Sequence, residues 1–301
     1  MFSIRFWGVR GSIPCPGPET AVFGGNTTCL EIRADSKLII IDFGTGIRKL
    51  GAAIMADDSK KGPLDMDIFL THTHLDHLQG FHFFAPLFIP TSKIRIHGPF
   101  LPSGENLEDI FSNLTNYNYW PIRLQELSAK ITFQQICEKT LHIGDVEITS
   151  KYLNHPVICL GYRFEYKGKT IVVASDSEPF WNPFAAEKNN PLYDVIADKA
   201  GEKTVTEENK KLLTFMKNAD ILVYDSAYTE QEYASSRLNW GHTSFETAIA
   251  TASKAAAKKL VLFHHDPVRT DKVLSEFEKK YCGNYNGMEV MMAKENLVLE
   301  A

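Results

Sequence analysis

The sequence has no long apolar run. No segment of its 301 residues reaches the roughly eighteen uninterrupted apolar residues that a membrane span needs. The start of the chain, Met1 to Arg5, also lacks the basic residues and long apolar stretch of an export signal. We therefore expect a cytoplasmic protein with no membrane partner.

Cysteine is scarce as well. The chain holds five cysteines with no CxxC pair: Cys15, Cys29, Cys137, Cys159 and Cys282. An odd, scattered set in a chain of this length is typical of a reducing compartment, so we expect free thiols and no disulfide framework.

Positive charge is in deficit. Lys and Arg total 32 against 37 for Asp and Glu, which gives a net charge of −5. This balance does not suit a chain that binds nucleic acid by general attraction to phosphate, so the composition argues against nucleic acid as a bulk partner. Hydrophobic residues make up 44% of the chain, enough for a substantial core.

Apolar periodicity predicts an alternation of strands and helices. Strands are expected at residues 2–7, 28–33, 37–41, 67–70, 146–153, 160–166, 170–174, 221–224, 260–263, 289–292 and 297–299, and helices at 47–55, from 75 toward 84, and at 207–217, 245–257 and 272–281. The spacing of Thr243 and Glu246 predicts a capping box for the helix at 245–257.

No Ser, Gly or Pro-rich linker separates the halves of the chain. The pattern therefore predicts an α/β (α+β) protein with two packed sheets flanked by helices, in a single domain over residues 1–301. Segments 98–121 and 179–203 have weak periodicity and many turn formers, so we expect them to be insertions at the rim of the core.

The densest chemical signal is the run Thr71-His72-Thr73-His74-Leu75-Asp76-His77, directly after the expected strand 67–70. Along an extended strand end His72 and His74 point the same way, and Asp76 and His77 fall on the turn that follows. Two pairs of ligands can then face one point, an arrangement that suits two neighbouring metal ions.

This HxHxDH run resembles the signature of the metallo-β-lactamase superfamily, whose fold is a four-layer αββα sandwich. The resemblance continues at three later positions, where family members carry metal ligands: His155 in Leu-Asn-His-Pro, Asp176 in Ala-Ser-Asp, and His264 in Leu-Phe-His-His-Asp-Pro. It implies two divalent ions, with Asp176 bridging them. Imidazole and carboxylate ligands suit zinc, and they also accept manganese or iron.

Two histidines compete for the last ligand position. His264 follows directly from the strand at 260–263, whereas strict alternation turns His265 to the opposite side. We therefore expect His264 to be the ligand and keep His265 as its rival.

Two further segments resemble the ribonuclease Z-like phosphodiesterases of this superfamily. They are Val223-Tyr224-Asp225-Ser226 and Trp240-Gly241-His242-Thr243-Ser244, with Thr-Ser in place of the family's Ser-Thr. The resemblance implies that Asp225 orients His242 and that His242 acts on a phosphoryl group. The alternative is that these residues only cap a helix and end a strand.

The predicted activity is that of a binuclear metal-dependent hydrolase. Its catalytic residues are expected to be Asp76, His242 and Asp225, its nucleophile a hydroxide shared by the two metals, and its substrate a small or cyclic nucleotide-like phosphodiester. Cleavage of a lactone, thioester or β-lactam on the same fold stays an alternative, as does a non-catalytic metal-binding sensor. A homodimer also stays open.

Overall fold

The computed structural model describes residues 1–185 and 193–301 and contains two β-sheets. Among the described residues, one sheet has seven strands in the order β15-β1-β2-β3-β4-β5-β6, and the other has eight in the order β13-β14-β12-β11-β10-β9-β8-β7. The strands of the first sheet are β1 Phe2–Gly8, β2 Cys29–Ala34, β3 Lys37–Ile41, β4 Asp65–Phe69, β5 Lys93–Pro99, β6 Lys130–Ile136 and β15 Val298–Glu300. Those of the second are β7 Thr140–Ile143, β8 Val146–Leu153, β9 Cys159–Tyr166, β10 Lys169–Ala174, β11 Ile221–Asp225, β12 Lys259–Phe263, β13 Gly283–Tyr285 and β14 Met288–Met292.

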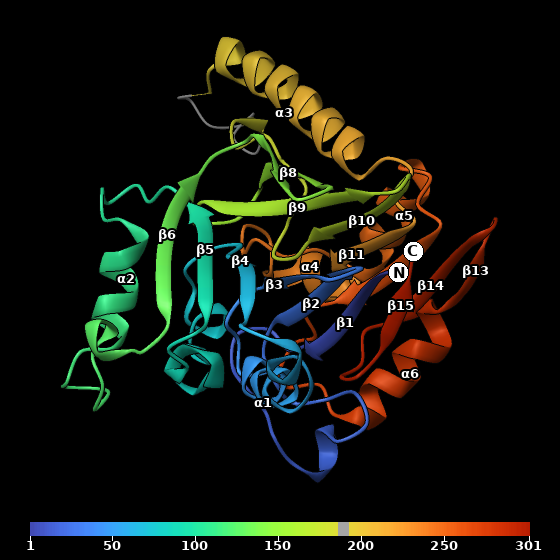
Figure 1. Ribbon diagram of the computed structural model, residues 1–301. Helices are drawn as coiled ribbons and strands as arrows, with labels where there is room; N and C mark the ends of the chain where they lie inside the picture. The colour runs from blue at the N-terminus through green and yellow to red at the C-terminus, as the bar shows by residue number, and fades with distance from the viewer. Residues whose placement is uncertain (186–192) are drawn as a thin grey trace.

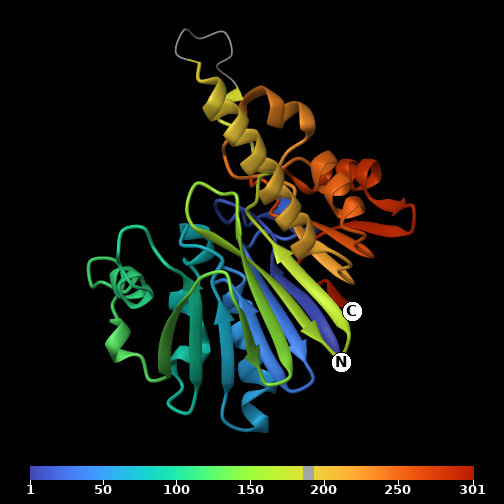
Figure 2. The ribbon, with the colours of Figure 1, turned by 90° about the horizontal axis from the view of Figure 1, so that it is seen from above.

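Helices cover the outer faces of both sheets (Figures 1 and 2). They are α1 Ile47–Asp57, α2 Leu107–Leu114, α3 Val195–Met216, α4 Glu230–Ser236, α5 Phe245–Lys254 and α6 Asp271–Tyr281. In Figure 2, seen from above, the blue α1 lies outside the first sheet, and the yellow to red helices α3 to α6 lie beside the second. The αββα prediction is thus confirmed.

Buried side chains divide into three clusters that match the interfaces of four layers. One cluster joins the sheets, with Phe6 and Ile32 against Phe164 and Val173. A second packs the outer face of the first sheet under α1, and a third packs the second sheet under α3, α5 and α6. Because central strands such as β3 are buried on both faces, they read as continuous apolar runs and not as alternating ones.

The expected helix from Leu75 toward Phe84 is wrong. The chain forms short 3-10 turns there, at Leu75–His77, Phe81–Phe83 and Ala85–Phe88. The Phe43 amide donates to the His77 carbonyl, and the Phe43 carbonyl accepts from the Gly80 amide, both at 2.7 Å. These two backbone hydrogen bonds interrupt helical pairing in the segment. Tertiary contacts therefore override the local apolar spacing.

Segment 98–121 is more regular than predicted, because it contains the end of β5 and the whole of α2. The expected helix 207–217 begins much earlier, at Val195, where the Asp194 side chain accepts hydrogen bonds from the first helical amides. Of the expected insertion 179–203, residues 186–192 lie outside the described residues. The single domain over residues 1–301 stays a prediction, in keeping with the core that the two sheets share.

Within the described residues, no helix is long and apolar enough to cross a membrane.

Candidate active site

The predicted site residues follow strand ends that meet at one edge of the sandwich. In the first sheet, β3 and β4 run parallel and end at Ile41 and Phe69. In the second, β10, β11 and β12 also run parallel. The carboxyl ends of neighbouring parallel strands lie together, and in open α/β sheets this edge is where ligands bind.

Three of the polar residues beyond these strands have left-handed backbone: Asp42 with φ 62°, Asp176 with φ 54° and His264 with φ 66°. Asp and His tolerate this conformation better than most residues, yet it still costs about 1–3 kcal/mol at each position. Such strained residues cluster at functional sites, where the surrounding fold holds them in place.

The HxHxDH run turns its four polar side chains toward one region. His74 is the last extended residue before the 3-10 turn that carries Asp76 and His77. The ring of His72 lies 4.6 Å from that of His74 and 4.2 Å from that of His77, centroid to centroid.

One group of possible ligands is formed by His72, His74 and His155, each of which offers a ligand atom within 4.8 Å of the others. The Nδ1 of His155 donates to the Gly241 carbonyl at 3.0 Å, and the Nδ1 of His72 donates to the Thr71 hydroxyl at 3.0 Å. In both rings Nε2 is then the electron-donating nitrogen; that of His72 has no hydrogen-bond partner among the described residues, and that of His155 lies 3.1 Å from His74 Nδ1. Burial lowers the pKa of His155 to about 4, so its ring is neutral and able to bind a metal.

A second group is formed by Asp76, His77 and His264, again within 4.8 Å. Asp176 lies between the two groups. Its carboxylate is 3.1 Å from His264 Nε2, 3.4 Å from His77 Nε2 and 3.8 Å from His72 Nε2. The geometry therefore places Asp176 where a carboxylate could serve both groups.

The residues fit divalent metal ions. Among the described residues, the buried Nε2 atoms of His72, His77 and His264 have no hydrogen-bond partner. Buried polar atoms without partners are costly, and inward-facing imidazoles beside carboxylates are the ligands that zinc and related ions prefer. An ion at each group would satisfy these atoms.

Charge in the site supports the same interpretation. Burial lowers the pKa of His264, but the carboxylates of Asp176 and Asp76 outweigh it and raise the pKa to about 10. Burial raises the pKa of Asp176, but His264 and His77 outweigh it and hold it well below its ordinary value. The carboxylates thus favour positive charge in the cluster, which bound divalent ions would supply.

Asp42 supports the cluster from behind, and it was not among the predicted site residues. It is fully buried. Its carboxylate accepts from His77 Nδ1 at 2.8 Å, from the Thr71 amide at 2.7 Å and from the Thr71 hydroxyl at 2.8 Å. The available signal was its position directly after β3, which pairs in parallel with the strand that leads to His72.

His242 and Asp225, which the sequence predicted as a catalytic pair, lie together in the structure. His242 Nδ1 donates to Asp225 Oδ2 at 2.7 Å, and the other oxygen of Asp225 accepts from the Thr243 amide at 3.0 Å. The His242 ring stacks on His264 at 4.8 Å and meets His155 edge-on at 5.3 Å. It therefore contacts one residue from each group of possible ligands.

The capping residue of α5 is Ser244 and not Thr243. The Ser244 side chain accepts a hydrogen bond from the Thr247 amide. The capping box predicted from Thr243 and Glu246 is therefore wrong, because the cap lies one residue later in the chain. His242 consequently lies two residues before the cap. Its position depends on Asp225 and not on the helix.

The structure brings His264 and not His265 to the cluster. His265 is buried, but its Nε2 donates to the Ala293 carbonyl at 2.9 Å and its ring meets Phe23 edge-on. Gly11 packs directly on His264, so closely that a Cβ at position 11 would lie 2.1 Å from the His264 ring. The next residue, Ser12, donates its amide to Asp76 Oδ2 at 2.7 Å.

Sequence reasoning missed a buried acid, Glu178, beside the site. Its carboxylate accepts from the Tyr233 hydroxyl at 2.6 Å and from the amides of Asn239 and Gly241 at 2.9 and 3.0 Å. Glu178 therefore fixes the loop that carries His242. The same loop contains Gly241, whose carbonyl orients His155. The only signal was an acid two residues after Asp176.

Three other histidines have structural or exposed positions. His82 binds the Leu114 carbonyl and His97 binds Asp67, each at 2.8 Å, and His142 is exposed.

Comparisons with known proteins identify the family. A Beta-lactamase superfamily domain matches residues 38–193, just over half of the chain. The ribonuclease Z of Thermoplasma acidophilum is 26% identical over 96% of this chain and 94% of its own, and that of Clostridium acetobutylicum is 28% identical over 98% and 100%. The crystal structure of human tRNase Z, short form, superimposes with a TM-score of 0.63 at 16% identity, covering 99% of this chain and 98% of the other.

These relatives correct the prediction about partners. The expectation of a small-molecule substrate, with nucleic acid argued against, is wrong, because the relatives that cover nearly the whole chain are named as ribonucleases. Net charge failed as a guide because it sums over the whole surface, whereas a substrate meets only the residues around the site.

The match also confirms the prediction of a metal-dependent hydrolase with a phosphodiesterase-type resemblance. The site and the match together show that this chain belongs to the metallo-β-lactamase superfamily.

Proposed function

We propose that the chain is a phosphodiesterase that cleaves RNA. The observation that carries the proposal is the hydrogen-bonded pair of His242 and Asp225. The His242 ring stacks on His264, which belongs to the candidate metal cluster. The names of the relatives support RNA as the substrate class.

We further propose that the cluster holds two divalent ions, zinc being the best match to its donors. The first would be held by His72, His74 and His155, the second by Asp76, His77 and His264, with Asp176 shared. When bound, such ions polarise phosphoryl oxygens and lower the pKa of water.

The protein's own contribution is proton transfer and positioning. Because His242 Nδ1 donates to Asp225, its Nε2 is the nitrogen left for the substrate. With the ring held in this orientation by Asp225, His242 can pass a proton from Nε2 to the oxygen that leaves when the phosphodiester bond breaks. Asp225 is a positioning residue for this step.

A cation beside His242 supports a nucleic-acid substrate. The guanidinium of Arg237 lies over the rings of Trp240 and Tyr228, at 4.4 and 5.6 Å from their centroids, and Tyr228 in turn meets His242 edge-on at 6.2 Å. Within the described ranges Arg237 forms no ion pair, and its hydrogen bonds go to Ser236. A cation and an exposed indole can bind a phosphate and a base of single-stranded RNA.

Arg123 offers a matched control for this cation. Its guanidinium lies 4.1 Å from the ring centroid of Tyr117, so it also stacks on an aromatic side chain. It follows α2 in the chain, and α2 lies at the left edge of Figure 1, whereas α4 lies near its centre.

The proposed function is tested with zinc-loaded protein, a 5′-labelled single-stranded RNA, a precursor tRNA and DNA of the RNA's sequence. We expect wild type to cleave RNA in at least one form and His242→Ala to cleave it far more slowly with unchanged zinc content. Failure to cleave any RNA, with zinc bound, would overturn the proposal.

A further inference from the structure

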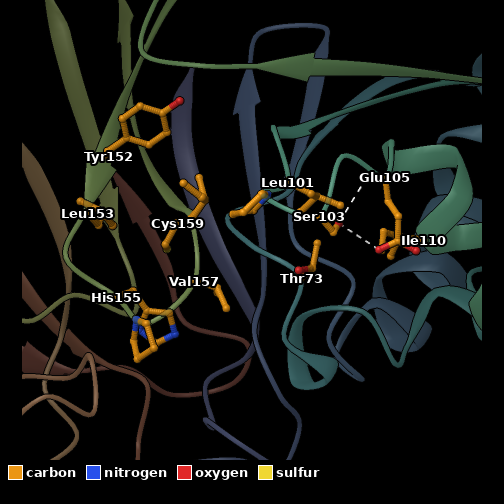
Figure 3. Close-up of a pocket in the computed structure, with 13 residues that line it drawn as sticks. Thr73, Leu101, Ser103, Glu105, Ile110, Tyr152, Leu153, His155, Val157 and Cys159 are labelled. Atoms are coloured by element: carbon orange, nitrogen blue, oxygen red, sulfur yellow. Dashed lines mark hydrogen bonds between the residues drawn. The ribbon is translucent and has the colours of Figure 1, made fainter.

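A pocket of about 430 Å³ opens directly beside the candidate metal cluster and shares His155 with it. Figure 3 shows its two walls. Thr73, Ser103, Glu105 and Ile110 lie on one side, and Tyr152 and Leu153 lie on the other. A substrate whose phosphate lies at the cluster therefore has a neighbouring group within reach of this side pocket.

The walls favour a flat, uncharged group. Most lining side chains are apolar, among them Leu101, Ile110, Leu153 and Val157, and no Lys or Arg is among the lining residues that the structure describes. A phosphate would find no counter-charge here. An aromatic base would bury its faces against aliphatic side chains and the ring of Tyr152, which is half-buried.

One carboxylate gives the side pocket polarity. Glu105 accepts a hydrogen bond from the Ser103 hydroxyl at 3.0 Å, and its own amide donates to that hydroxyl at 3.3 Å. The carboxylate is thus held by a local turn. An ionised carboxylate only accepts hydrogen bonds, so its ligand must present N–H or O–H groups.

We propose that the side pocket binds the nucleobase on one side of the scissile phosphate and selects guanine through Glu105. This rests on the proposed RNA cleavage. Guanine presents N1–H and N2–H₂ side by side, which match the two oxygens of a carboxylate. Uracil presents one N–H between two carbonyl oxygens, which the carboxylate repels.

The segment expected as a rim insertion at 98–121 thereby has a role in the site, because Leu101, Glu105 and Ile110 belong to it. The residue to test is Glu105. Glu108 is its matched control, since it is an exposed acid in the same segment that does not line the side pocket.

The experiment compares kcat/KM for short RNAs that differ only in the bases flanking the cleaved bond. For wild type and Glu108→Gln we expect guanine to be preferred over uracil by about tenfold on one side of the bond. For Glu105→Gln we expect most of this preference to disappear. Tyr152→Ala should raise KM for every base, while Tyr119→Ala, at an exposed tyrosine outside the side pocket, should not.

A substrate without a base separates this inference from the proposed function. Bis-p-nitrophenyl phosphate should be hydrolysed equally by wild type and Glu108→Gln. RNA cleavage without base preference, or a guanine preference that survives in Glu105→Gln, would overturn the inference and leave the proposed function standing. Hydrolysis of this diester with no cleavage of any RNA would overturn the proposed function itself.

Discussion

Substituting Asp42 by Asn tests whether the carboxylate behind His77 tunes metal binding. Asp42 is fully buried, and its carboxylate accepts the His77 Nδ1 proton at 2.8 Å. Asn has the same shape and tolerates the left-handed backbone at this position, φ 62°, so the fold should survive. What changes is the charge that holds the ring in place and makes its Nε2 a stronger donor.

The expected loss is about 10- to 100-fold in metal affinity, the usual cost of removing such a partner. This corresponds to about 1.4–2.7 kcal/mol of binding free energy. The assay is competition for zinc against a chelator of known affinity, with circular dichroism and thermal unfolding measured in parallel.

Asp67→Asn is the matched control. Asp67 is also a buried aspartate that accepts from a histidine, His97, at 2.8 Å, but its partner is not one of the possible ligands. It should lower stability without changing zinc affinity. Wild-type zinc affinity in Asp42→Asn, or an equal loss in Asp67→Asn, would refute the reasoning.

Four further predictions complete the tests. His242→Ala should lower turnover of diesters with poor leaving groups by about 10²- to 10⁴-fold and that of bis-p-nitrophenyl phosphate much less, because p-nitrophenolate needs little protonation; equal losses on both would contradict the role. His264→Ala should lose zinc on dialysis while His265→Ala keeps it, and elemental analysis showing the reverse would exchange the two assignments. Arg237→Gln should weaken RNA binding and lower the slope of log K against log salt by about 0.7, whereas Arg123→Gln should leave the slope unchanged. For Asp67→Asn, urea titrations between pH 3 and 6 should show a free energy of unfolding that depends less on pH than that of wild type. Burial raises the pKa of Asp67, but hydrogen bonds from the neighbouring imidazole and guanidinium outweigh burial and lower it. The wild-type carboxylate therefore stabilises the fold above about pH 4 and loses this contribution as the pH falls, and identical profiles would contradict this.

Most strands were predictable from the sequence because burial determines their pattern, although β5, β6, β7 and β13 were not among the ranges expected. The run Lys37–Ile41 and the run Ile221–Asp225 are apolar and β-branched, and no helical period competes with them. The HxHxDH cluster was predictable for a related reason, since its ligands are close in the chain.

Features that depend on distant contacts were not predictable. The turns after Leu75 form because Phe43, more than thirty residues away, holds their backbone. The role of Asp42 required knowing that β3 and β4 pair in parallel. In contrast, α2 had a local signal that was overlooked, the capping box of Asn106 and Asp109.

The substrate could not be derived from composition. A net charge of −5 says nothing of where Arg237 and Trp240 lie, and only the structure shows that Tyr228, on which Arg237 also stacks, meets His242. Likewise, the side pocket joins residues near 105 and 152, which no local pattern relates.

Anomalous scattering from crystals of zinc-loaded protein tests the central claim most directly. The account predicts two zinc peaks per chain, one among His72, His74 and His155 and one among Asp76, His77 and His264, with Asp176 between them. A single peak, or peaks bound outside this cluster, would contradict it.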